Sequence, residues 1–140
     1  MSTDTQDRTF IVRNSEKCFR FKDEAIINHA PPHKGIYELV TFDENQKPEV
    51  LYVGAAFDKN INECLEGHAN GSLEPKASDL LEKHPNLYFD FLTQMTHAKT
   101  VDDAQDVHWW LVQKYKPKYN DVNNIQNSGR AGAIKAVEED

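Results

Sequence analysis

The chain has 140 residues, of which 39% are hydrophobic and 28% charged, an ordinary composition for one globular domain. Its formal net charge of −7 disfavours a general duplex-binding protein, since such proteins usually present a basic surface to the phosphates. No stretch approaches the length of a membrane span, and the first eight residues lack the apolar core of a secretory signal. We therefore expect no membrane contact and a cytoplasmic location.

We divide the chain into three parts: an N-terminal segment (1–30) packed on the core, a central domain (31–120) and a C-terminal extension (121–140). Within the N-terminal segment, the β-prone run at residues 9–13 favours an edge strand or a segment packed under the sheet. A short helix is predicted over 22–29, because the two prolines that follow cannot continue it. The two cysteines of the chain form no disulfide pattern and are expected to be free thiols.

Two apolar runs around a polar turn indicate a β-hairpin between Gly35 and Gly54. Side chains alternate along a strand, so Tyr37 shares a face with Leu39, and Tyr52 shares one with Gly54. We therefore expect both phenols to point into one shallow site.

The rest of the chain alternates helical and extended patterns. The longest predicted helix begins with Thr100 as its cap and Asp103 three residues on, and it ends before Pro117. The C-terminal extension is predicted to form a short helix or a frayed tail. The other predicted elements are a helix over 58–67 that Gly67 stops, a helix over 75–84 and a strand over 87–94. Together these elements predict an α/β fold with a small three-stranded antiparallel sheet flanked by helices.

Three features together resemble the GIY-YIG nuclease superfamily. The hairpin carries Gly35-Ile36-Tyr37 on one strand and Tyr52-Val53-Gly54 on the other, with a longer turn than usual. A helix ending near His68 follows, and Pro117 with Asn120 is similar to the Pro-x-x-Asn signature of the family. The resemblance extends over the central domain and implies an α/β sandwich that hydrolyses phosphodiester bonds with a divalent metal ion.

The resemblance also implies a set of site residues, in which two charged groups are replaced. Cys64 stands at the position of the arginine that neutralises phosphoryl charge, and His108 stands at that of the metal-binding glutamate. Loss of such an arginine can lower the rate by roughly 10³ to 10⁵. We therefore expect impaired hydrolysis. The retained family positions are Tyr37, Tyr52, His68 and Asn120.

The same substitutions suggest a different metal site. Cys64 and His68 are one helical turn apart, and His108 would approach from the longest helix. One thiolate and two imidazoles suit zinc better than magnesium. The alternative interpretation is that all three residues are structural. A divalent ion, zinc or magnesium, at the tyrosine site is therefore a hypothesis.

Three lysines, Lys114, Lys116 and Lys118, form the visible basic cluster. They are candidates for nucleic-acid contacts, although lysines also gather at helix C-termini because they complement the helix dipole. Three functions stay open. The first is a catalytically degenerate GIY-YIG-like module that binds nucleic acid or protein, the second an atypical metal-dependent endonuclease, and the third a protein-interaction domain without nucleic-acid contact.

Overall fold

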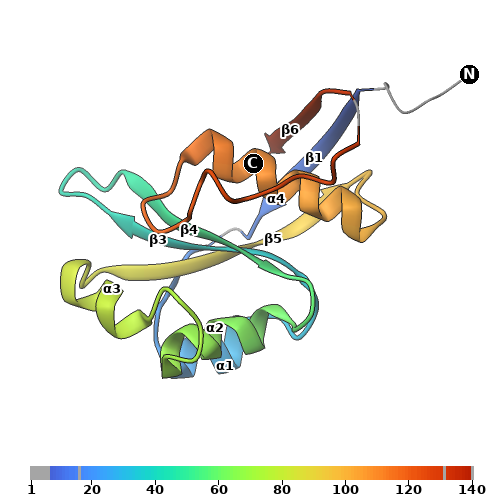
Figure 1. Ribbon diagram of the computed structural model, residues 1–140. Helices are drawn as coiled ribbons and strands as arrows, with labels where there is room; N and C mark the ends of the chain where they lie inside the picture. Colours follow the sequence, from blue (N-terminus) through green and yellow to red (C-terminus); the bar gives the residue numbers. More distant parts are fainter. Residues whose placement is uncertain (1–6, 16, 131, 140) are drawn as a thin grey trace, which may run out of the picture.

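A computed structural model describes residues 7–15, 17–130 and 132–139, so the first six residues of the predicted N-terminal segment lie outside it. Ten helices and strands follow one another within these residues (Figure 1). The strands are β1 (Arg8–Asn14), β2 (Phe19–Arg20), β3 (Gly35–Phe42), β4 (Pro48–Ala56), β5 (Leu87–Thr96) and β6 (Ile134–Glu139). The helices are α1 (Asp23–His29), α2 (Ile61–Asn70), α3 (Ala77–Lys83) and α4 (Val101–Tyr115).

The strands form one mixed sheet of six strands in the order β4-β3-β5-β1-β6, with the short β2 also beside β5. The predicted three-stranded antiparallel sheet is therefore wrong. The antiparallel strands β3, β4 and β5 form only part of the sheet, because β1 continues it beyond β5 and β6 adds a parallel strand to β1. The C-terminal helix or frayed tail is wrong for the same reason, since residues 134–139 pair with β1.

Helices cover both faces of the sheet: α1, α2 and α3 lie on one face and α4 on the other (Figure 1). Two hydrophobic clusters follow from this arrangement. Alternation along β3 places Ile36 in the cluster on the α4 face and Tyr37 in the cluster on the α2 face. The sheet therefore separates residues of α2 from residues of α4.

The boundaries of two helices bear on the site. The predicted stop of α2 at Gly67 is wrong, because the helix continues to Asn70 and ends at Gly71, whose φ is 85°. Gly67 instead permits close packing, since a Cβ there would lie 2.8 Å from Leu73 Cδ1. At α4, the predicted cap is confirmed, with Thr100 and Asp103 forming a capping box. No helix in the described ranges is long and apolar enough to cross a membrane.

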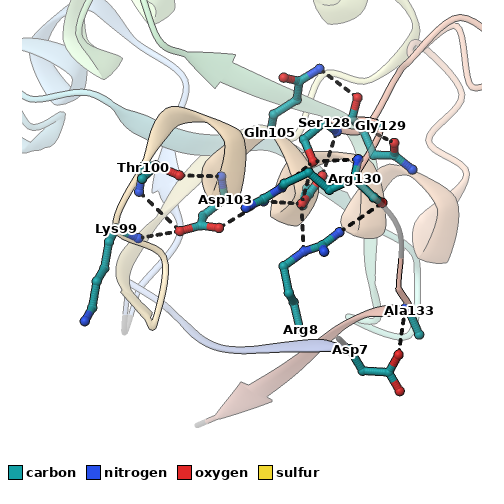
Figure 2. Close-up of polar contacts among 12 residues, drawn as sticks. Asp7, Arg8, Lys99, Thr100, Asp103, Gln105, Ser128, Gly129, Arg130 and Ala133 are labelled. Carbon is teal, nitrogen blue, oxygen red and sulfur yellow. Dashed lines mark hydrogen bonds and ion pairs between the residues drawn. The ribbon is translucent and has the colours of Figure 1, made fainter. Parts of the chain in front are cut away.

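A buried aspartate of α4, Asp106, pairs with two arginines far apart in the chain, Arg8 and Arg130, which Figure 2 shows close to each other. Asp106, whose side chain is fully buried, receives Arg130 Nη2 at 2.6 Å and lies 3.2 Å from Arg8 Nε. The backbone amide of Ser128 donates to the same carboxylate at 2.7 Å, and Arg130 also bridges to Asp103. These contacts, called the Asp106 clamp below, hold β1 and the segment before β6 against α4.

Candidate functional site

A pocket of about 360 Å³ opens between the β3–β4 hairpin and α2. It brings together four of the predicted site residues, namely Tyr37, Tyr52, Cys64 and His68. Because α2 extends past Gly67, His68 is helical and lies one turn beyond Cys64 on the same face. Its remaining lining residues are Ala55, Phe57, Asp58, Lys59, Leu73 and Glu74.

The hairpin register aims both phenols at this pocket. Tyr37 is paired with Gly54, and Tyr52 with Leu39, so the two rings share a face with their centroids 6.3 Å apart. The ring of Tyr37 lies over Gly54, where a Cβ would be only 2.1 Å from Tyr37 Cζ. Gly54 therefore provides the space that the Tyr37 phenol occupies.

Tyr37 and His68 form a buried hydrogen-bonded pair. The Tyr37 hydroxyl lies 2.6 Å from His68 Nε2, and His68 Nδ1 lies 2.9 Å from the carbonyl oxygen of Pro75. A carbonyl oxygen can only accept, so Nδ1 carries the proton and donates to Pro75. In neutral His68, Nε2 then accepts the hydrogen bond from the Tyr37 hydroxyl.

Burial keeps this pair uncharged near neutral pH. It lowers the pKa of His68, an effect that the hydrogen bond to Pro75 only partly offsets, and it raises the pKa of Tyr37. Nearby Tyr52 and Cys64 raise the pKa of Tyr37 further. Burial also raises the pKa of the Cys64 thiol, although Lys59 counteracts this. The pocket therefore presents a phenol, a thiol and an imidazole, all neutral.

The structure places His108 away from these residues. It lies on α4, across the sheet from α2, and its Nε2 donates to the carbonyl oxygen of Val53 at 2.9 Å. Burial lowers the pKa of His108. The predicted convergence of Cys64, His68 and His108 on one metal ion is thus not what the structure shows. Among the described residues, no three or more His, Cys, Asp and Glu side chains are grouped so that they could hold a metal.

Asn120 also lies outside the pocket and supports it from the edge of β4. Its Oδ1 accepts from the backbone amide of Val53 at 2.7 Å, and its Nδ2 donates to the carbonyl of Val53 at 3.0 Å. Beside it, the amide of Tyr119 donates to the carbonyl of Leu51. Asn120 therefore makes the two hydrogen bonds to Val53 that a further strand beside β4 would make. In this way it positions the part of the hairpin next to Tyr52.

The three lysines predicted for nucleic-acid contacts lie around the end of α4, and none lines the pocket. Lys114 Nζ pairs with Glu138 at 2.9 Å and lies 5.3 Å from the centroid of the Trp110 ring. Lys116 is the C-cap of the helix, with a φ of 45°. These contacts favour the structural interpretation, in which Lys114 and Lys116 stabilise the C-terminal end of α4 and do not contact nucleic acid. Lys118 lies just beyond it.

Sequence reasoning missed the charged lining of the pocket. Lys59 and Asp58 immediately precede α2, and Glu74 comes from the loop that follows it. Phe57 adds a second aromatic wall beside Tyr52. The sequence did contain a signal for these residues. Phe57-Asp58-Lys59 connects the hairpin to the N-cap of the next helix, so its side chains lie beside the end of β4, where the pocket opens.

The comparisons with known proteins identify no family for this chain. No protein-family model matches the sequence, and no curated protein or solved structure is significantly similar to it.

Proposed function

We propose that the chain is a divergent GIY-YIG-like binding module, catalytically degenerate, that holds a segment of single-stranded nucleic acid at the tyrosine pocket. The observation that carries this proposal is the buried, uncharged Tyr37–His68 pair. Tyr37 and His68 are only 2% and 1% exposed, so the pair stabilises the pocket more readily than it activates water. Cys64, at the position of the family's arginine, brings no charge to a phosphoryl group.

The accessible lining suits a base and its phosphate. Tyr52 and Phe57 are partly exposed aromatic walls, and aromatic rings stack on bases of any sequence. Lys59 is an exposed cation close enough to influence the pKa of Cys64. A ligand that depends on stacking rather than on many phosphate contacts is compatible with a net charge of −7.

The second candidate is an atypical metal-dependent endonuclease, and a specific observation favours it. His68 Nε2 is placed to take the proton of Tyr37, and the carboxylates of Asp58 and Glu74 line the same pocket. Magnesium is often held by one or two carboxylates together with the phosphates of the substrate. Such a site would form only when the nucleic acid is bound.

Fluorescence anisotropy with labelled single-stranded DNA and RNA, and with the matching duplexes, tests the binding proposal. We expect the single strands to bind more tightly than the duplexes, and Tyr52→Ala to weaken binding by about tenfold through the lost stacking. Lys59→Ala should weaken binding and reduce its salt dependence. Lys47→Ala, in the exposed hairpin turn, is the matched control. If no strand binds, the proposal fails in favour of a protein-interaction domain.

A cleavage assay separates the two candidates. The same oligonucleotides are incubated with Mg²⁺ or Mn²⁺ and with the wild-type chain, Tyr37→Phe or Glu74→Gln. We expect binding without cleavage. Cleavage that is lost in both variants would establish the endonuclease instead, because it would require both the phenol and the carboxylate.

A further inference from the structure

The two edges of the sheet differ in whether their outward backbone groups have hydrogen-bond partners. At β4, Asn120 and Tyr119 occupy backbone groups of Val53 and Leu51. At the other margin, β6 pairs with β1, and no second strand lies beside it within the described residues. Figure 1 shows β6 and β1 together at one end of the sheet, away from α1, α2 and α3. An uncovered edge of this kind can add another strand.

The β1–β6 ladder determines which backbone groups of β6 point outward. Arg8 N donates to Ala133 O, and the pairing then runs in parallel from Arg8 opposite Ile134. In a parallel ladder, alternate residues of the added strand bond to its neighbour. Lys135, Val137 and Glu139 therefore direct their N–H and C=O groups toward β1. Residues 134, 136 and 138 direct theirs toward the free edge.

The side chains on the outer face of β6 form a self-complementary pattern. Lys135, Val137 and Glu139 are exposed, and Val137 is a large apolar residue that is 40% exposed. The other face, which includes the buried Ala136, packs toward α4. The outer face thus has an apolar centre with Lys135 on one side and Glu139 on the other, and Glu139 also lies 3.5 Å from Arg13 of β1.

We propose that two copies of this chain associate through their β6 edges, antiparallel, about a two-fold axis at Val137. Val137 of each copy then lies opposite Val137 of the other, and each Lys135 lies opposite Glu139 of the second copy. Ala136 and Glu138, whose backbone groups point outward, form the hydrogen-bonded pairs between the copies. This association continues the sheet across two molecules and is independent of the tyrosine pocket.

The direction of the backbone groups and the charges select this register. Residues that face each other across an antiparallel pair must both point outward or both point inward, so only even displacements are allowed. A displacement by four residues in one direction places Lys135 against Lys135, and in the other direction Glu139 against Glu139. Like charges directly opposite are unfavourable. A displacement by two in either direction removes both ion pairs. Like charges therefore disfavour the two registers displaced by four residues, and the two displaced by two residues lack the ion pairs of the proposed one.

Sedimentation equilibrium of the full chain tests the proposal over concentrations from about 1 μM to about 1 mM. Physiological salt screens the long-range repulsion between two copies of net charge −7. We expect a monomer–dimer equilibrium that Lys135→Glu weakens by about tenfold or more, because two attractive pairs become two repulsive ones. Glu139→Lys should also weaken the dimer, and it removes the Arg13–Glu139 ion pair within each chain as well. Lys116→Glu, on the exposed C-cap of α4, is the control and should leave the dimer intact.

Mixing the two charge variants gives the sharpest result. Lys135→Glu faces Glu139→Lys favourably at both pairs, so a heterodimer should form from two chains that do not self-associate. Amide exchange should also slow with concentration at Ala136 and Glu138, while Val137, bonded toward β1, changes little. A wild-type chain that stays monomeric, or a mixture that is not rescued, overturns the proposal and leaves this edge to another extended chain.

Discussion

Two carboxyl groups lie opposite each other inside the molecule, Glu38 on β3 and Asp90 on β5, and they are 3% and 7% exposed. If both were ionised, Glu38 Oε2 and Asp90 Oδ1 would have no hydrogen-bond donor among the described residues. Burial raises the pKa of both groups, and Glu138 raises them further, while Lys114 lowers that of Glu38. The Cys18 thiol, whose pKa burial and Asp90 raise to about 12, donates to Asp90. Glu38 and Asp90 therefore share one proton in the folded state.

This pair makes the stability of the fold fall as the pH rises. Both folded pKa values lie above the unfolded values of about 4, so the folded state holds a proton that the unfolded state releases. The stabilisation is complete below pH 4 and is lost as the pH rises through the folded pKa values. Glu38→Gln supplies a permanent donor to Asp90, and we expect it to stabilise the fold by about 1–2 kcal/mol at pH 8.

Urea unfolding of both proteins between pH 5 and pH 9 measures this difference. The exposed residue Glu49 on β4 provides the control, and Glu49→Gln should change stability by less than about 0.5 kcal/mol at any pH. A Glu38→Gln protein that is less stable than the wild type at pH 8 would mean that the pair is ionised and stabilised in another way.

The side chain of Asn120 completes the hydrogen bonding of the β3–β4 hairpin at its outer edge. Asn120 satisfies both backbone groups of Val53, and the carbonyl of Val53 also accepts from His108 across the sheet. Neither side chain touches the pocket, yet both hold the residue next to Tyr52. These two positions, attributed to catalysis by the family resemblance, are better understood as positioning residues for the second tyrosine strand.

Asn120→Ala should therefore destabilise the fold by about 1–3 kcal/mol, because the backbone amide of Val53 loses its partner and the carbonyl of Val53 keeps only the hydrogen bond from His108. The free energy of unfolding in urea measures the effect. Asn123→Ala, at an exposed position of the same segment, should have little effect. Equal stability of the two variants would show that water replaces Asn120 at β4 without cost.

Local patterns predicted most of the elements but not how they assemble. The hairpin, α1, α3, β5 and the capped α4 follow from alternation, helical spacing and turn residues. The second strand of the β1–β6 pair could not be predicted this way, because residues 134–139 have no strong strand pattern of their own and form a strand by pairing with β1. In the site, Tyr37, Tyr52 and Cys64 followed from the hairpin and the next helix. The position of His108 could not be predicted, because tertiary packing decides which face of the sheet α4 covers.

The Asp106 clamp joins three distant parts of the chain. Burial alone would raise the pKa of Asp106, but the Ser128 amide and Arg130 outweigh it and lower the pKa. The carboxylate is therefore charged in the folded state and stabilises the fold above the unfolded pKa of about 4. This contribution is lost as the pH falls through the lower, folded pKa.

Asp106→Asn should destabilise the fold by about 3 kcal/mol at pH 7, because Arg8 and Arg130 keep their charges and lose the carboxylate. Urea unfolding measures the loss, and hydrogen exchange should show it first in β1 and β6. The control is Asp102→Asn on the exposed side of the same helix, which should differ from the wild type by less than about 0.5 kcal/mol. Matching stabilities of the two variants would show that the clamp is energetically neutral.

The Asp106 clamp can form only late during synthesis on the ribosome, because it joins the first strand to residues near the end of the described chain. Arg8 reaches the backbone of Arg130 across a separation of 122 residues, so β1 leaves the exit tunnel long before β6 exists. The hairpin and α2 can collapse as they emerge, because their contacts are close in the chain. Until residues 134–139 follow, β1 can attach to β5 but has an uncovered margin of its own. A nascent chain stalled before this point would expose the unpaired edge of β1. Another nascent chain on the same messenger RNA could pair with that edge.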